Sequence, residues 1–205
     1  MSGTLYIIAA PSGAGKTSLV KALLEREQGI TLSVSYTSRP PRPGEIDGQH
    51  YHFVSRDVFE HMATNGAFFE HANVHGDYKG TARTAVEPLL SADRDVLLEI
   101  DWQGAQQVRT KWPDAVSIFI LPPSRVELER RLRQRASDSP EQIARRIADS
   151  RTEIARAREF DYIVINDDFA QALRDLQAIF ACRRLRRDAQ LGRHQALLDD
   201  LLKPA

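Results

Sequence analysis

Residues 10–17, APSGAGKT, have the residue types and nearly the full spacing of a loop that binds nucleotide phosphates. Gly13 and Gly15 allow the backbone to turn its N–H groups toward phosphate oxygens. Lys16 would add a cation near the β- and γ-phosphates, and Thr17 would offer its hydroxyl to Mg²⁺. The candidate donor-phosphate residues are Ala10, Pro11, Ser12, Gly13, Ala14, Gly15, Lys16 and Thr17.

The sequence on either side of this loop supports the same interpretation. The apolar residues 5–9 predict a strand before the loop, and residues 18–24 predict a helix after it. Such a helix would point the positive end of its dipole at a bound anion. Ala10 stands where the general pattern begins with glycine. An ordinary glycine-rich turn is the alternative, but it leaves a Lys-Thr pair at a helix start unexplained.

Two acidic residues stand at the end of a strand predicted at residues 96–101. Because Glu99 and Asp101 alternate with Ile100, we expect both on one side of that strand. Ligands of parallel α/β sheets bind beyond the carboxyl ends of the strands, where residues 10–17 would also lie. The pair could hold a hydrated Mg²⁺ through water or accept a hydrogen bond from a substrate base. Solvated acids at a strand end are the simpler alternative.

The proline-rich stretch 37–45 carries Arg39 and Arg42. Three prolines exclude a helix there, so these arginines are expected on a stiff loop. They could hold a second phosphate through paired N–H donors, or they could be solvated loop charges.

Residues 124–158 are rich in arginine and predict two helices separated by a break at residues 136–139. A lid of this kind could close over the donor phosphates, supply positive charge and exclude water. A solvated helical hairpin with i, i+4 ion pairs is the alternative. The arginines considered for the lid are Arg131, Arg135 and Arg146.

The composition is that of an ordinary soluble globular protein, with 42% hydrophobic and 27% charged residues in a chain of 205. The 28 basic and 28 acidic residues balance, so net charge gives no support for binding nucleic acid or an anionic membrane. The single cysteine, Cys182, excludes an intrachain disulfide and fits a reducing compartment. We recognise no signal peptide and no apolar run of membrane-spanning length, and we expect a cytoplasmic protein.

Uninterrupted apolar strands alternate with helices along the chain, which predicts an α/β fold with a parallel sheet flanked by helices on both faces. The later strands are expected at residues 96–101, 116–121 and 162–165. Between the first α/β elements, short strands, glycine turns and one helix predict a small, mostly-β insertion. One long helix is expected from about residue 169 to residue 201.

Eight segments, in the expected order along nearly the whole chain, resemble the bacterial guanylate kinase family. They are APSGAGKT, SVSYTSRPPRPGE, HYHFV, FFEHA, GDYKGT, LLEIDWQGAQQV, FILPPS and VINDD. This similarity is more specific than the phosphate loop alone. It implies a P-loop kinase core at residues 1–33, 82–123 and 159–205, a GMP-binding insertion at residues 34–81 and a helical lid at residues 124–158.

The resemblance also implies a reaction, namely Mg²⁺-dependent, in-line phosphoryl transfer from ATP to GMP, and to dGMP. The product GDP would serve guanine nucleotide biosynthesis and GMP recycling. The implied partners are ATP and GMP with Mg²⁺ as cofactor, without nucleic acid or membrane, and a homo-oligomer is compatible with the sequence.

Residue by residue, the resemblance assigns three sets of roles. The residues implied in catalysis are Lys16, Arg39, Arg42, Arg135 and Arg146. Those implied in GMP binding are Ser35, Arg39, Arg42, Tyr51, Glu70, Lys79, Thr81 and Asp101. Asn166 would lie near the donor nucleotide, and Thr17 and Glu99 would serve Mg²⁺, Glu99 through water.

Two details of the implied acceptor site have a chemical consequence. Glu70 and Asp101 would accept hydrogen bonds from the N1 and N2 donors of guanine, a donor pair that adenine lacks. Lys79 stands where the family usually has the second of two tyrosines before glycine. A lysine can contact a phosphate as a point charge but does not reproduce the geometry of a phenol, so the substitution bears on GMP affinity.

Two other classes of function compete with this prediction. A related P-loop kinase could act on a phosphorylated sugar or another nucleotide, but it would not need Glu70 and Asp101 placed for a guanine edge. A non-catalytic interaction module with this fold would be expected to have lost phosphate-loop residues, which this chain retains.

Overall fold

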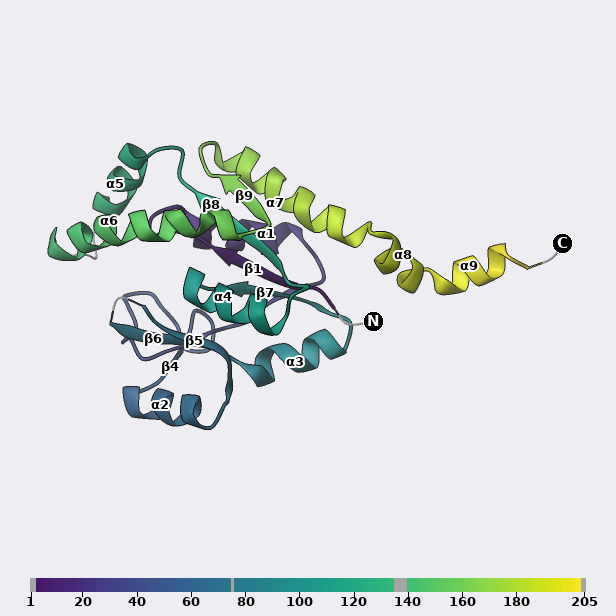
Figure 1. Cartoon of the computed structure of the whole chain (residues 1–205), viewed down its shortest axis with the longest axis horizontal. Coiled ribbons are helices and arrows are strands. Elements are labelled where there is room, and N and C mark those ends of the chain that lie inside the picture. The colour runs from purple at the N-terminus through teal and green to yellow at the C-terminus, as the bar shows by residue number, and fades with distance from the viewer. Residues whose placement is uncertain (1–2, 75, 135–139, 204–205) are drawn as a thin grey trace.

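The computed structural model describes residues 3–74, 76–134 and 140–203. Its main sheet has five parallel strands in the order β2-β7-β1-β8-β9 (Figure 1). They are β1 (Leu5–Ala9), β2 (Ile30–Leu32), β7 (Asp95–Glu99), β8 (Val116–Leu121) and β9 (Tyr162–Ile165). Every residue of the central strand β1 is buried, which requires cover on both faces of the sheet. The predicted parallel α/β core is confirmed.

Helices supply this cover. On one face lie α1 (Lys16–Arg26) and α7 (Phe169–Arg184), and on the other lie α3 (Arg83–Ser91) and α4 (Trp102–Lys111) (Figure 1). Because side chains alternate along β1, the core divides into two layers. The first layer contains Tyr6, Ile8, Leu19, Leu23, Leu173 and Phe180. The second contains Leu5, Ile7, Val86, Leu90, Leu98 and Val108.

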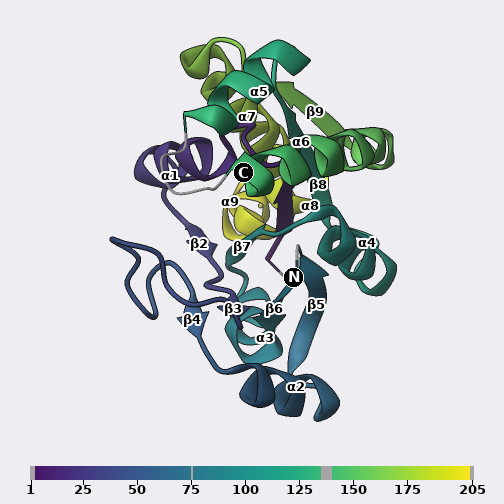
Figure 2. The ribbon, with the colours of Figure 1, turned by 90° about the vertical axis from the view of Figure 1, so that its left-hand side faces the viewer.

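A second, smaller sheet has the strand order β4-β3-β6-β5 and lies below the main sheet in Figure 2. Its elements are β3 (Tyr36–Thr37), β4 (His52–Phe53), α2 (Arg56–Thr64), β5 (Phe68–Val74) and β6 (Asp77–Ala82). This mixed sheet confirms the predicted small, mostly-β part of the fold.

The small sheet has two chemically different faces. On one face Phe59 of α2 stacks on Phe68 and Tyr78, with ring centroids 4.4 and 5.3 Å apart. On the other face Glu70 is paired across the strands with Thr81, and Lys79 is paired with Thr37 and Ala72. Because residues that oppose each other across strands share a face, the polar residues gather on the side away from the aromatic cluster.

The segment between β8 and β9 is helical, as predicted. It consists of α5 (Arg125–Arg133), α6 (Pro140–Ala155) and the short 3-10 helix η1 (Arg156–Glu159). Leu128 and Leu132 of α5 are buried, and the remaining surface of these helices is largely charged. The predicted break at residues 136–139, and with it Arg135, lies outside the described residues.

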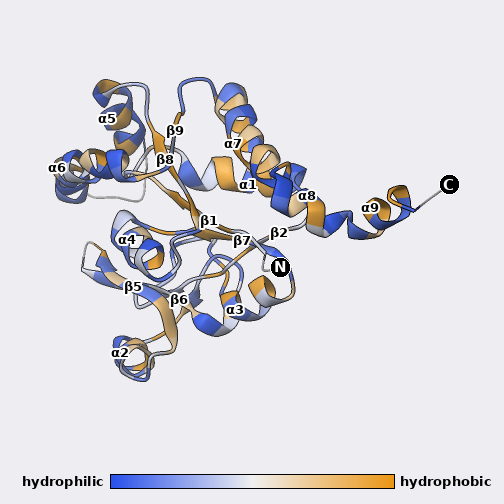
Figure 3. Cartoon of the chain, turned by 45° about the vertical axis from the view of Figure 1, so that its right-hand side comes forward, coloured by the Kyte–Doolittle hydropathy of each residue, from blue (hydrophilic) through white to orange (hydrophobic). Residues whose placement is uncertain are grey.

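The expectation of one long C-terminal helix is wrong. Helix α7 ends at Arg184 and is followed by α8 (Arg187–Arg193) and α9 (Gln195–Leu201). The backbone leaves helical geometry at Arg186, with ψ 142°, and at His194, with φ −114°. No residue of α8 or α9 is buried, and the two helices extend away from the main sheet (Figures 1 and 3). Because α8 and α9 have no packed face, the core does not hold them on the axis of α7.

Within the described chain, no helix combines the length and apolar character that crossing a bilayer requires.

The stacking of Phe180 on Tyr6 should contribute strongly to stability. Both side chains are fully buried, and their ring centroids are 4.0 Å apart. We expect Phe180→Ala to lower the free energy of unfolding in urea by about 3–5 kcal/mol, because it leaves a large cavity. The control Phe169→Ala, at a side chain that is 43% exposed, should lose less than about 1 kcal/mol. Equal losses in the two variants would contradict this packing.

Candidate active site

The phosphate loop connects the buried strand β1 to helix α1. Gly13 and Gly15 both have φ of 90°, the left-handed conformation that glycine adopts without strain. Helix α1 begins at Lys16, with Gly15 as its N-cap residue. The loop, its glycines and the helix start therefore occupy the places that the sequence predicts.

The Lys16 and Thr17 side chains reach the end of the neighbouring strand β7. The Lys16 Nζ donates to the carbonyl of Ile100 at 2.8 Å, and the Thr17 hydroxyl donates to Glu99 Oε1 at 2.5 Å. The structure thus brings a hydroxyl and a carboxylate oxygen together beside the loop. Both are ligand types that Mg²⁺ accepts, directly or through water.

Asp101 differs from its expected place. Strand β7 ends at Glu99, and Asp101 is the N-cap of α4, where its Oδ1 accepts from the backbone N–H groups of Gln103 at 2.8 Å and Gly104 at 2.9 Å. The expectation that Asp101 continues the strand is therefore wrong. Capping satisfies backbone donors that a helix start would otherwise leave without partners.

Glu70 is a buried carboxylate, with only 3% of its surface exposed. The Thr81 hydroxyl donates to its Oε1 at 2.7 Å, and the Ser35 hydroxyl lies 3.4 Å from that of Thr81. The pKa of Glu70 is raised to about 7: burial is the largest cause, the hydrogen bond from Thr81 opposes it, and the negative charge of Asp101 adds to the rise.

The close approach of α4 to Glu70 depends on a glycine that sequence reasoning missed. A Cβ atom on Gly104 would lie 2.3 Å from Glu70 Oε2, closer than two such atoms can approach. Glycine in a helix costs stability relative to alanine, and this is the signal in the sequence that could have pointed to Gly104. The small residue leaves room for the carboxylate.

Lys79 is half-buried on the same face of the small sheet as Glu70. Its pKa is lowered to about 8: burial is the largest cause, the nearby cations Lys16, Arg39 and Arg42 contribute, and the negative charge of Asp101 acts in the opposite direction. Four cationic groups from three segments thus act on one region, which is the electrostatic arrangement of an anion site.

The two arginines of the proline-rich loop are held by Glu45, which sequence reasoning did not single out. Its Oε1 accepts from the Arg39 guanidinium at 2.8 Å, and its Oε2 accepts from the Arg42 backbone N–H at 2.6 Å. The Arg39 guanidinium carbon lies 5.5 Å from the centre of the Tyr51 ring. The loop is therefore ordered by contacts of its own. Tyr51, which the family resemblance puts in the GMP-binding set with Arg39, lies beside it.

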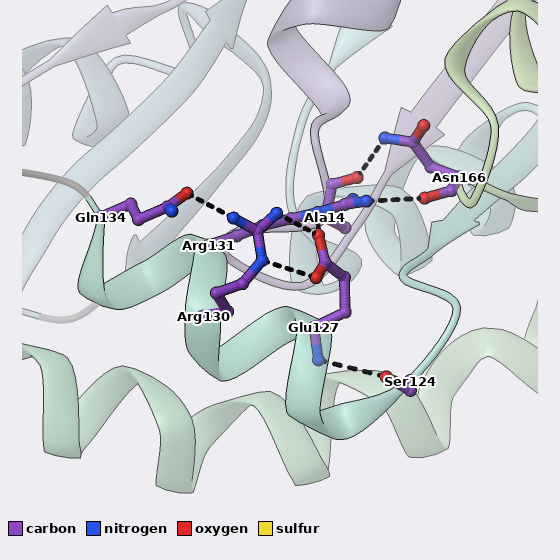
Figure 4. A network of polar contacts seen from close by, with 7 residues as sticks. All are labelled: Ala14, Ser124, Glu127, Arg130, Arg131, Gln134 and Asn166. Atoms are coloured by element: carbon purple, nitrogen blue, oxygen red, sulfur yellow. Dashed lines mark hydrogen bonds and ion pairs between the residues drawn. The ribbon is translucent and has the colours of Figure 1, made fainter.

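Helix α6 contacts the phosphate loop at Ser12. The Arg146 guanidinium donates to the Ser12 hydroxyl at 3.4 Å, and Glu153 Oε2 accepts from the Ser12 backbone N–H at 3.1 Å. The structure thus brings Arg146 to the loop, together with an acid that sequence reasoning missed. Arg131 lies on α5, where it donates to Glu127 Oε1 at 2.7 Å and to the carbonyl of Asn166 at 3.1 Å (Figure 4).

Asn166 lies just past β9 and is buried, with 5% of its surface exposed. Its side-chain amide donates to the carbonyl of Ala14 at 2.7 Å (Figure 4). The side chain therefore contacts the phosphate loop itself.

Comparison with known proteins identifies the family. The guanylate kinase family model matches residues 2–182. A guanylate kinase of Xanthomonas euvesicatoria pv. vesicatoria is 59% identical over 203 residues, which cover 99% of this chain and all of that protein. A guanylate kinase of Xylella fastidiosa (strain Temecula1) is 59% identical over 204 residues and covers both chains completely. The crystal structure of guanylate kinase from Anaplasma phagocytophilum superposes with a TM-score of 0.80 at 30% identity, over 99% of this chain and 97% of that one. This chain belongs to the guanylate kinase family.

Proposed function

We propose that this chain is a guanylate kinase that transfers the γ-phosphoryl group of ATP to GMP and to dGMP, with Mg²⁺. The observation that supports this function best is the pairing of a phosphate loop with a buried carboxylate, Glu70, beside Asp101. The loop matches the donor, and the carboxylates match the acceptor base. Family membership supports the same reaction.

In this proposal the polar face of the small sheet reads the guanine base. Glu70 and Asp101 accept hydrogen bonds from guanine N1–H and the exocyclic amine, while Ser35 and Thr81 complete the hydroxyl relay that ends on Glu70. AMP would place no donor pair against Glu70 and Asp101, and a polar group of the site that is buried by a ligand without a partner is costly.

The acceptor phosphate would be held by Arg39, Arg42, Tyr51 and Lys79. The donor phosphates would lie in residues 10–17 with Asn166 at the back of the loop. Lys16, Arg146 and Arg135 would neutralise the transferring phosphoryl group, Arg135 being assigned from the family pattern alone. Thr17 and Glu99 would hold Mg²⁺, which when bound offsets negative charge on the phosphate oxygens.

We keep the division into a core (residues 1–33, 82–123 and 159–205), a GMP-binding insertion (34–81) and a lid (124–158) as part of the proposal. Phosphoryl transfer needs positioning and exclusion of water, so the insertion and the lid would close on the two nucleotides.

Lys16→Ala tests the donor site. We expect kcat to fall by about 100-fold or more, because a cation that stabilises the transferring phosphoryl group is lost. The control Lys21→Ala, at an exposed position of the same helix, should keep the wild-type rate. Turnover by Lys16→Ala close to that of the control would remove Lys16 from this role.

Glu70→Gln tests the base-reading role. The variant keeps the size of the side chain but presents an amide donor to the donor groups of guanine. Discrimination of GMP over AMP in kcat/KM should shrink by roughly 1–3 kcal/mol. Glu60→Gln, an exposed change on α2, is the control. Unchanged selectivity in Glu70→Gln would exclude Glu70 from base recognition.

The same variant should gain stability. Because the pKa of Glu70 rises from 4.5 in the unfolded chain to about 7 in the fold, the folded chain binds the extra proton between these values. The contribution of Glu70 to the free energy of unfolding of the wild type therefore falls as pH rises from about 4.5 to about 7. At pH 8 we expect Glu70→Gln to unfold at higher urea concentration, with a gain of about 2–3 kcal/mol. Loss of stability at pH 8 would contradict the raised pKa.

Lys79 should make GMP binding depend on pH. Its pKa of about 8 means that the ammonium is lost as pH rises through this value. If the ammonium contacts the GMP phosphate, KM for GMP should rise about tenfold between pH 7 and pH 9.5, the effect of one charged hydrogen bond. Lys79→Arg stays charged over this range and should remove most of the rise. Identical profiles for the two proteins would exclude Lys79 from the phosphate site.

A further inference from the structure

The phosphate loop touches one buried side chain that comes from the far end of the sequence. Asn166 follows the edge strand β9, and its amide Nδ2 lies 2.7 Å from the carbonyl oxygen of Ala14. The contact bridges 152 positions in the chain and joins two buried residues. A buried hydrogen bond of this kind constrains both partners, because breaking it leaves polar groups without water.

The geometry of the peptide unit carries this constraint to the next residue. In a trans peptide the C=O of one residue and the N–H of the next point in opposite directions, and no cis peptide occurs among the described residues. Holding the Ala14 carbonyl on Asn166 therefore points the Gly15 N–H away from Asn166. In a phosphate loop, the direction of these N–H groups is what binds the anion.

The loop backbone lies directly against the amide. A Cβ atom on Gly15 would lie 2.3 Å from Asn166 Nδ2. Gly15 is therefore required for two reasons, its φ of 90° and the space taken by Asn166. The glycine and the amide fit each other.

Asn166 is in turn held from the other side by the lid segment. Its backbone carbonyl accepts from the Arg131 guanidinium at 3.1 Å, and the same guanidinium donates through Nε to Glu127 at 2.7 Å. Figure 4 shows the resulting chain of hydrogen bonds from Glu127 through Arg131 and Asn166 to Ala14. Asn166 is thus held by its position directly after β9 and, through its backbone carbonyl, by Arg131 of α5.

We propose that Asn166 is a positioning residue for the phosphate loop: its amide holds the Ala14 carbonyl so that the following N–H is oriented for the donor phosphates. Asn166 then contributes to ATP binding through the loop backbone. This inference rests on the proposed function of residues 10–17 as the ATP-phosphate site.

Asn166→Asp tests the inference with a carboxyl group of the same shape. An ionised carboxylate cannot donate to the Ala14 carbonyl, whereas a protonated carboxyl can. Burial raises the pKa of a carboxyl group, so we expect the protonated form at about pH 5.5 and the ionised form at about pH 8.5. Asn166→Ala is the companion variant, since it lacks a donor at every pH.

The measurement is calorimetric binding of ADP with Mg²⁺ to each folded variant, expressed relative to wild type at the same pH. At about pH 8.5 we expect both variants to bind about tenfold or more weakly, the effect of one lost buried hydrogen bond. At about pH 5.5 Asn166→Asp should recover most of this loss and Asn166→Ala should not. In steady-state assays at about pH 8.5, KM for ATP should rise while KM for GMP stays unchanged.

Equal weakening of both variants at both pH values would overturn the donor role of Asn166, and so would wild-type binding by both. If Asn166→Ala does not fold, the pH dependence of ADP binding by Asn166→Asp tests the donor role alone. If Asn166→Asp does not fold at high pH, the test is the comparison at low pH, where only Asn166→Ala should bind ADP more weakly than wild type. Failure of wild type to bind ADP with Mg²⁺ would instead contradict the proposed function, so the two failures are distinguishable.

Discussion

A phosphate loop works only if several backbone N–H groups point to one side, and the structure of this chain depends on meeting that constraint. Strand β1 fixes the start of the loop because all of its residues are buried in the main sheet. The Lys16 ammonium and the Thr17 hydroxyl hold the end of the loop on the adjacent strand β7. Asn166, just past the last strand β9, donates to the loop at Ala14, and Glu153 of α6 accepts from the loop at Ser12. Elements far apart in sequence therefore converge on one short turn, and the α/β order of the chain is what brings them together.

The region around Glu70 and Lys79, the proposed acceptor site, differs from the loop because its ionisable groups lie where burial disfavours their charge. Glu70 has a raised pKa and Lys79 a lowered pKa, and in both cases burial is the largest cause. Ionisable groups with strongly shifted pKa values are typical of functional sites. The small sheet separates these roles by face, with the aromatic cluster of Phe59 supporting the polar side from behind.

Much of this arrangement could be predicted from the sequence, because its signals are local. Continuous apolar runs predicted β1, β7, β8 and β9 of the main sheet, and APSGAGKT predicted the loop and the start of α1. What the sequence did not reveal depends on tertiary contacts. Asp101 caps α4 where a continued strand was expected, and the C-terminal segment breaks at Arg186 because no core holds it straight. Glu45 and Gly104 act through partners that only the fold brings near, so neither could be recognised from spacing alone.

In the proposed function, one site joins phosphoryl transfer from ATP to recognition of guanine. The most direct measurement is a coupled assay of ADP production by the wild-type chain with ATP and Mg²⁺, using GMP, dGMP, AMP, UMP and ribose 5-phosphate as separate acceptors. We expect turnover with GMP and dGMP, and a kcat/KM for AMP that is lower by about 100-fold or more, because adenine lacks the donor pair that Glu70 and Asp101 accept. Comparable rates with AMP, or turnover of the sugar phosphate alone, would contradict it.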